Sequence, residues 1–506
     1  MDVLQNLALG FGEVLTPSIL VYAIVGCALG MLTGVLPGFG PAAATALLLP
    51  LSFVLGPTGS IVMIATIYYG SMYGGTITSV LLNVPGETAS VATCLDGYAM
   101  TKRGRAGQAL SIAAIGSFIG GMIAFLGMIF ATQFSSLALA LGPAELFALS
   151  VLALGMVVGL GGRSVIKGLV AATLGLFVGL VGLDPVTGSP RFTMGVPDLR
   201  SGIDFVAVVM GIFGLAEILE SIGRRTVIDF TGNIGSVRVR WQDVKESRGA
   251  IGRGTVIGFF FGLIPGSPAA ACSFASYAAE KKFSKTPERF GKGAIQGVAG
   301  PETANNALAI SNFIPLITFG IPSSATMAIL LGALTINGLQ PGPLLFEQQP
   351  KVVWGLIASL AVANVILLIM ALPLVKFWVA LLRIPTLTLY AVTLGFMTVG
   401  AYTLTNSTFN VGVMWVAGLI GFGLRRLGVP MAPAALTLVL GPMLEDNFRL
   451  ALSMANGNLA GLVSTPVTAA AYLTILAVAA FKIAAHARKR ASRPIDHHEE
   501  PSSTGR

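Results

Sequence analysis

Two acidic residues stand beside proline and glycine in stretches of otherwise apolar sequence. Glu302 lies in a Gly-Pro-Glu-Thr segment, and Glu87 follows a Pro-Gly pair. An ionisable side chain at membrane depth is a candidate cation ligand or proton carrier. For Glu302 the alternative is a helix cap near the membrane surface, because an acid in the first turn after a proline is favourable. We take Glu302, Thr303 and Glu87 as candidates for ion coupling and keep this alternative open.

Hydroxyl, amide and glycine residues gather around four proline-centred breaks in the apolar sequence. A break frees backbone N–H groups, which attract an anion at a helix start, and carbonyl groups, which suit Na⁺. Glycine lets a solute approach the backbone closely. The alternative is that these side chains only hold neighbouring helices together. The candidate substrate-binding residues are Pro37, Gly38, Gly40, Tyr73, Gly74, Gly75, Thr76, Asn83, Pro85, Gly86, Pro265, Gly266, Ser267, Asn305, Asn306, Pro322, Ser323 and Ser324.

The breaks recur in the two halves of the chain. The segment Gly30–Ala44 aligns with Gly258–Ala271, and Pro265 follows Pro37 by 228 residues (265 − 37). A second pair, Asn83-Val84-Pro85-Gly86 and Gly320-Ile321-Pro322-Ser323, follows in the same order. A chance alignment is the alternative, because glycine and proline are common in membrane helices. Two pairs in one order favour an internal repeat.

Charge placement predicts how the repeated segments enter the membrane. Basic residues flank 254–279 on both sides, whereas none flanks Pro37. Each arm of 254–279 is about 12 residues, or roughly 18 Å long, which is half a bilayer. We therefore expect re-entrant Pro-Gly hairpins that enter from opposite faces, as in two inverted-topology repeats.

Composition sets the fold class. Of 506 residues, 54% are hydrophobic and only 10% are charged, against about 25% charged in soluble proteins. We predict an all-α polytopic membrane protein with about 10–14 transmembrane segments of roughly 17–25 residues each. Lys and Arg sit in short loops between apolar runs, which is a topology signal and argues against nucleic-acid binding.

The same composition argues against an enzyme. The three cysteines form no CxxC pair, and all three histidines lie in the C-terminal tail. No Walker A motif occurs, so the sequence indicates no ATP chemistry. We expect no cofactor other than a coupling Na⁺ or H⁺ and no metal site beyond a possible Na⁺.

The chain divides at its most polar stretches. We predict a first membrane repeat at 1–223, a basic cytoplasmic linker at 224–253, a second membrane repeat with following helices at 254–481, and a disordered cytoplasmic tail at 482–506. The N-terminus lacks the basic region of a signal peptide, so we expect the first helix to be retained.

The segments GVLPGFGPAAATALLLP, YYGSMYGGTITSVLLNVPGETASVATCLDGYAMTKRGRAGQAL, GLIPGSPAAACSFASYAAEKK, GAIQGVAGPETANNA and LITFGIPSSATMAILLGAL resemble the large permease of the tripartite tricarboxylate transporters, the TctA family. The resemblance covers nearly the whole chain. It departs at Ser323 and Ser324, where a glycine is expected after the proline.

This resemblance implies ion-driven secondary uptake across the bacterial inner membrane by a multi-pass subunit. It also implies two partners, a small membrane subunit and a periplasmic substrate-binding protein. The implied substrate is citrate or a related di- or tricarboxylate. An anion channel, or a carrier for an unrelated small solute, remains the alternative, and both an elevator and a rocking motion are compatible with the repeats.

Overall fold

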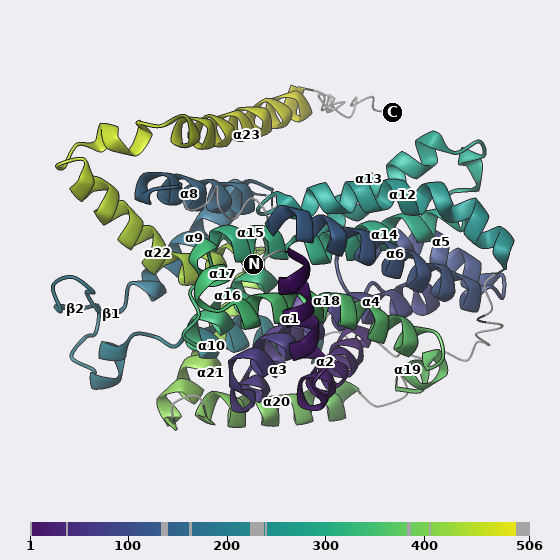
Figure 1. The fold of residues 1–506 in the computed structure, drawn as a ribbon, viewed down its shortest axis with the longest axis horizontal. Helices are drawn as coiled ribbons and strands as arrows, with labels where there is room; N and C mark the ends of the chain where they lie inside the picture. The colour runs from purple at the N-terminus through teal and green to yellow at the C-terminus, as the bar shows by residue number, and fades with distance from the viewer. Residues whose placement is uncertain are drawn as a thin grey trace, which may run out of the picture.

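Helices make up most of the described residues, and most of the long ones run along the longest dimension of the molecule (Figure 1). The computed structural model describes residues 3–36, 39–132, 140–160, 164–222, 237, 240–381, 386–403 and 406–491. Two short antiparallel strands, β1 (Gly182–Leu183) and β2 (Pro190–Arg191), are the only strands in these ranges, and they project from the helices.

Several helices of the first half have proline in their first turn. The N–H that proline lacks would have no partner within the helix at that position. Its elements are α1 (Val3–Val14), α2 (Pro17–Val35), α3 (Pro41–Ser52), η1 (Phe53–Leu55), α4 (Gly56–Leu82), α5 (Val91–Lys102), α6 (Ala106–Thr132), α8 (Pro143–Leu160) and α9 (Val165–Gly179). After the strands come η2 (Pro197–Ser201), α10 (Phe205–Val209), the π-helical turn η3 (Met210–Leu215) and α11 (Ala216–Ile222).

The second half opens with a helix pair separated by the Pro265-Gly266 break. Its elements are α12 (Trp241–Leu263), α13 (Ala269–Phe283), η4 (Pro287–Arg289), α14 (Gln296–Ser311), α15 (Phe313–Phe319), α16 (Ala325–Ile336), α17 (Pro343–Gln348), α18 (Pro350–Ala371), α19 (Val375–Leu381), α20 (Thr386–Thr403), α21 (Thr408–Arg426), α22 (Ala432–Met454), η5 (Leu459–Val463) and α23 (Pro466–Ala491).

Helix α12 is longer than the half-membrane arm expected from the sequence. It has 23 residues and starts at Trp241, so 241–253, which we assigned to the linker, is helical. The Asp243 carboxylate accepts a hydrogen bond from the Arg240 N–H at the helix start, which stabilises this early start. Residues 223–236, 238–239 and 492–506 lie outside the described ranges, and the predicted domain division stays a prediction.

Among the described residues, five helices are long and apolar enough to cross a membrane: Pro17–Val35, Ala106–Phe130, Phe205–Ile222, Pro350–Ala371 and Thr408–Arg426. Six shorter apolar helices accompany them. Because only helices satisfy their own backbone in lipid without closing a barrel, this arrangement agrees with the predicted all-α membrane protein.

Glycines let one helix pair in each half pack almost backbone to backbone. A Cβ atom on Gly30 of α2 would lie 2.2 Å from the Ile67 carbonyl of α4, and one on Gly258 of α12 would lie 2.2 Å from the Ala304 carbonyl of α14. Such close approach of small residues drives helix association in membranes. Gly258 follows Gly30 by 228 residues (258 − 30), and Ala304 follows Ile67 by 237 (304 − 67). The two close contacts therefore lie at similar offsets in the two halves.

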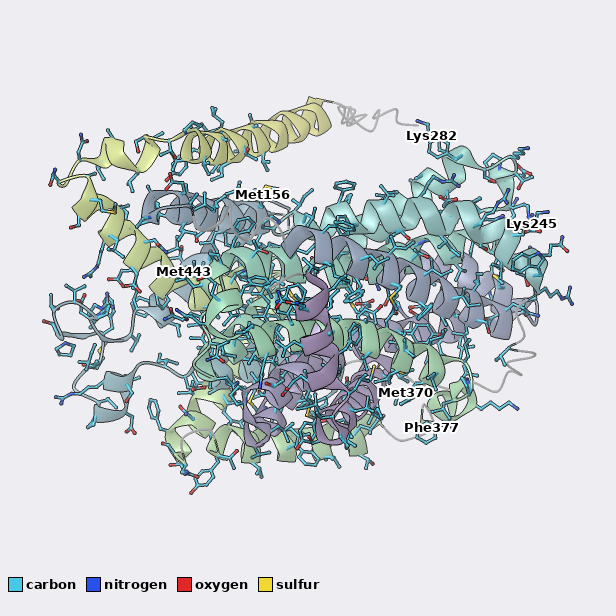
Figure 2. The ribbon with its side chains drawn as sticks, in the orientation of Figure 1. Met156, Lys245, Lys282, Met370, Phe377 and Met443 are labelled. Atoms are coloured by element: carbon cyan, nitrogen blue, oxygen red, sulfur yellow. The ribbon has the colours of Figure 1, made fainter. Side chains whose placement is uncertain are left out.

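Lysine residues of α12 and α13 lie at one end of the molecule, which we call the basic end. Lys245 and Lys282 lie there, whereas Met443 of α22 lies toward the opposite end, where β1 and β2 project (Figure 2). At the basic end, the Asp96 carboxylate accepts hydrogen bonds from the Tyr277 hydroxyl (2.9 Å) and from the backbone N–H groups of Gly293 (2.6 Å) and Ala294 (2.7 Å). Asp96 thereby ties α5 to α13 and to the start of α14.

Candidate functional site

Equivalent helix breaks precede a proline in both halves. Helix α4 ends at Leu82 and is followed by Asn83, with a φ of 58°, and α15 ends at Phe319 and is followed by Gly320, with a φ of 69°. Both residues adopt the left-handed conformation that asparagine and glycine tolerate best. The chain then runs without helix through Pro85 and Pro322. These prolines are 237 residues apart (322 − 85). The same number of residues separates Ile67 from Ala304, which Gly30 and Gly258 contact.

Glu302 lies at the centre of a buried polar cluster formed by three helices. Its side chain is buried within α14, in the second turn and not at the helix start. Its carboxylate accepts hydrogen bonds from the hydroxyls of Thr76 on α4 (2.6 Å) and Thr93 on α5 (2.5 Å). This buried position in the second turn does not match the surface helix cap that we kept as an alternative.

Glu87 meets the same helix one turn further on. The Asn305 amide of α14 donates to the Glu87 carboxylate (2.6 Å). The Pro85-Gly86 segment reaches this position because a Cβ atom on Gly86 would lie only 2.4 Å from the Cα of Gly75. Glycine at both positions therefore permits the close contact that places Glu87 beside α14.

Two amide oxygens in this cluster are unsatisfied. The Asn306 amide donates to the Ser117 hydroxyl on α6 (2.6 Å) and to the Glu302 carbonyl (3.1 Å). The Oδ1 atoms of Asn305 and Asn306 are both buried, and neither has a hydrogen-bond partner within the described ranges. Buried polar atoms are nearly always paired in folded proteins, so these two oxygens are unusual in having no partner among the described residues.

The breaks of the second half contact each other. The Gly266 N–H donates to the Ser323 carbonyl (2.8 Å), and the Ser267 hydroxyl donates to the Phe261 carbonyl (2.5 Å). Gly266 has a φ of 74°, and a Cβ atom there would lie 2.5 Å from the Val157 nitrogen. The Ser324 hydroxyl accepts from the Met327 N–H and caps α16. The departure from glycine at Ser324 therefore supplies a helix cap.

Other predicted site residues serve the packing. The Tyr73 hydroxyl donates to the Leu110 carbonyl on α6, and the Thr303 hydroxyl donates to the Ala299 carbonyl of its own helix. Gly74 packs against Met31 and Gly34, and Gly40 lies in the non-helical stretch before α3. Pro37 and Gly38 lie outside the described residues. The structure thus brings together Gly75, Thr76, Gly86, Glu87, Glu302 and Asn305 as one cluster, with Asn306 adjoining it.

Thr93 and Ser117 belong to this cluster but were not among the candidates predicted from the sequence. Both are ordinary hydroxyl residues on apolar helices, and their partners lie 209 and 189 residues away. The only feature of the local sequence that could have indicated Thr93 is its position shortly after Glu87 in the chain. Glu217 and Glu220 have Arg425 of α21 as an ion-pair partner, another contact between residues far apart in the sequence.

Comparison with known proteins identifies the family. The model of the "Tripartite tricarboxylate transporter TctA family" matches residues 20–436. An Agrobacterium vitis protein, "Uncharacterized 52.8 kDa protein in TAR-I ttuC' 3'region", is 43% identical over 93% of this chain and 94% of its own length. A second protein from that organism, "Uncharacterized protein in TAR-II ttuC' 3'region", is 43% identical over 42% of this chain and 88% of its own length. No solved structure matches. The chain therefore belongs to the TctA family of tripartite tricarboxylate transporters.

Proposed function

We propose that this chain carries small organic carboxylates, citrate or a related di- or tricarboxylate, across the bacterial inner membrane by ion-coupled uptake. The observation that carries the proposal is the buried polar cluster, where Glu87 and Glu302 accept hydrogen bonds from hydroxyl and amide groups on three helices, α4, α5 and α14. Membership of a transporter family supports this reading. Broken helices at membrane depth are tolerated only where they line a protein cavity.

The two carboxylates are suited to a coupling cation. Within the described part of the chain, neither Glu87 nor Glu302 has a Lys or Arg partner. An uncompensated buried charge costs several kcal/mol, so a proton or Na⁺ would neutralise at least one of them. Carboxylate and amide oxygens suit Na⁺, and the unsatisfied Oδ1 atoms of Asn305 and Asn306 add two acceptors. We assign the ion-coupling role to Glu87, Glu302, Asn305 and Asn306, and not to Thr303.

The substrate carboxylates would bind at the breaks of the second half. The amide groups that begin α16, after Pro322 and Ser323, are a favourable place for an anion. The Gly266 tip contacts this segment directly. A carboxylate held by N–H groups and hydroxyls needs no arginine, which agrees with the absence of Lys and Arg between Lys292 and Lys351.

Inverted topology of the two repeats is part of this proposal. The α2–α3 hairpin ends at Ser52, which is linked through Ser60 (3.0 Å) to Asn337 (3.2 Å) just beyond α16. The α12–α13 hairpin ends near Lys282, at the opposite, basic end (Figure 2). Opposite entry of equivalent hairpins is the arrangement of many secondary transporters. Cysteine labelling that placed Val14 and Lys281 on the same side of the membrane would contradict it.

The test is uptake of labelled citrate and other carboxylates by cells that express the chain with a small membrane subunit and a substrate-binding protein, with and without a Na⁺ gradient. We expect uptake that depends on an ion gradient. Glu302→Gln should abolish it, whereas Glu347→Gln, at an exposed position on α17, should not. Uptake that persists in the absence of any gradient would instead indicate a channel, and uptake of no carboxylate would exclude the substrate class.

A further inference from the structure

The loop between α9 and α10 presents apolar side chains to the surface. It contains β1, β2 and η2 and runs over residues 180–204. Met194 is 85% exposed and Val186 is 70% exposed. Leu183, Phe192 and Val196 are also exposed. We call these five side chains the apolar loop surface. Large exposed apolar groups gathered on one segment mark an interaction site more often than chance.

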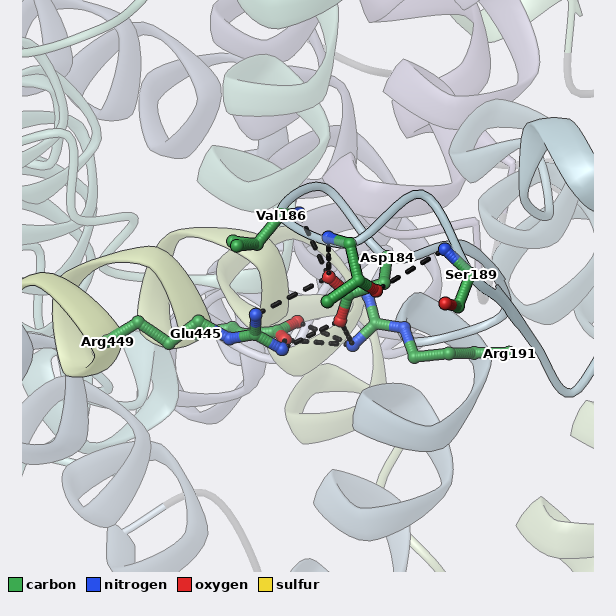
Figure 3. Close-up of polar contacts among 7 residues, drawn as sticks. Asp184, Val186, Ser189, Arg191, Glu445 and Arg449 are labelled. Atoms are coloured by element: carbon green, nitrogen blue, oxygen red, sulfur yellow. Dashed lines mark hydrogen bonds and ion pairs between the residues drawn. The ribbon is translucent and has the colours of Figure 1, made fainter.

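Partly buried ion pairs hold this loop against α22. Asp184 accepts hydrogen bonds from the N–H groups of Val186 (2.9 Å) and Thr187 (2.8 Å). Its carboxylate also pairs with Arg449 of α22 (2.7 Å), and Arg191 pairs with Glu445 (2.8 Å) (Figure 3). Arg449 bridges both acids through a further contact to Glu445 (2.5 Å). The four charges sum to zero, so the loop is fixed to α22 without creating a net charge.

The hydrocarbon of the bilayer cannot be what covers this surface. Strands β1 and β2 pair only with each other in the described structure, so their outer edges and the irregular backbone around them expose polar groups. Such backbone is not stable against lipid tails. The loop also projects beyond the helices, at the end of the molecule opposite Lys245 and Lys282 (Figures 1 and 2). By the positive-inside rule this end faces away from the cytoplasm.

Both ends of the loop help to line a cavity that reaches Gly320, the residue that follows α15. The cavity measures about 580 Å³ and is large enough for a small organic acid. Both ends of the loop line it, through Val181 and through Gly202 and Ile203, and so does Gly320 at the end of α15. A soluble protein seated on the loop would therefore lie beside a cavity that extends to Gly320, two residues before Pro322 of the candidate substrate site.

We propose that the apolar loop surface is the docking surface for the soluble substrate-binding protein of this transporter. The proposal rests on the proposed function, because it is the delivery of a small carboxylate that requires a soluble partner on this face. The partner must present an apolar patch, since Met194 and Val186 dominate the exposed surface. A loop held rigid before binding loses less conformational entropy when the partner docks.

The test measures direct binding, independent of transport. The chain and its small membrane subunit are placed in nanodiscs, and the affinity of the purified substrate-binding protein is measured by biolayer interferometry. Met194→Asp/Val186→Asp would bury two charges in an apolar contact, and we expect at least about 10-fold weaker binding. Met194→Leu should bind as the parent chain does. Trp241→Asp, at a 79% exposed position on the basic end, should also bind normally.

Each variant must elute as a single species and melt at the temperature of the parent chain, so that loss of binding is not loss of fold. Parental affinity in the doubly charged variant would overturn the proposal. So would quenching of a bimane label on Met194→Cys by lipid-borne quenchers, because the loop would then lie on the membrane. The native cysteines, Cys27, Cys94 and Cys272, are all buried, which keeps such labelling specific. Normal docking without carboxylate uptake would refute the proposed function alone.

Discussion

The hydrogen bond between Thr93 and Glu302 should be a strong interaction, and valine tests it with little change of shape. Thr93→Val keeps the branched side chain but removes the hydroxyl that donates to the buried carboxylate at 2.5 Å. Water cannot replace the lost donor readily, because Thr93 and Glu302 are both almost fully buried. The variant therefore leaves the Glu302 carboxylate with Thr76 as its remaining hydroxyl donor.

The expected magnitude follows from the charge on the acceptor. A hydrogen bond to a charged group contributes about 1.5–3 kcal/mol, compared with about 0.5–1.5 kcal/mol for a neutral one. We expect Thr93→Val to destabilise the protein by about 1.5–3 kcal/mol, or roughly 10- to 150-fold in the folding equilibrium. In a Glu302→Met background the carboxylate is absent, and the same substitution should cost close to nothing.

The assay is a double-mutant cycle on unfolding by SDS in mixed micelles. Thr101→Val is the matched control, because Thr101 lies on the same helix and donates to the neutral Val80 carbonyl (2.7 Å). The coupling energy between Thr101→Val and Glu302→Met should be near zero. A Thr93–Glu302 coupling below about 0.5 kcal/mol, within the usual error of additivity, would refute a charged hydrogen bond at this position. Equal couplings for Thr93 and Thr101 would refute it as well.

Two further predictions concern packing and pH. Gly258→Ala places a Cβ atom 2.2 Å from the Ala304 carbonyl and should destabilise by about 1–3 kcal/mol. Gly252→Ala on the same helix meets nothing within 4 Å and should raise the melting temperature, because alanine favours helix by about 1 kcal/mol. The Thr187 N–H, and then Arg449, hold the pKa of Asp184 below its usual value. Its stabilising contribution is therefore complete above the unfolded pKa of about 3.9 and is lost as pH falls through the folded pKa. Hydrogen-exchange protection factors at residues 186 and 187 should be equal at pH 7 and pH 5 in the parent chain, and already reduced at pH 7 in Asp184→Asn. Reduced protection in the parent at pH 5, or parental protection in the variant, would contradict this.

Features that depend on composition or on residues adjacent in the sequence could be predicted before the fold was known. The shortage of charge dictates a membrane protein, because nothing else can bury so much apolar sequence. The breaks at Pro85 and Pro322 follow from proline, which cannot donate a helical hydrogen bond. The repeat offset of 228 residues between Pro37 and Pro265 recurs between the packing glycines of α2 and α12. Glu87, Glu302 and Asn305 could be named as candidates because polar groups are costly in an apolar setting.

The partners of these groups were decided by tertiary packing. Thr93 reaches Glu302 across 209 residues of sequence, and Asp184 reaches Arg449 across 265. Neither threonine nor arginine carries a local signal that names its partner. The pairing depends on which helices lie side by side, and that is set by the close contact of small residues summed over whole helices. The prediction for 254–279 was incomplete for a related reason. Charge marked the membrane boundary near Arg253, but helix α12 starts at Trp241, beyond that boundary, because helical hydrogen bonds do not end where the membrane does.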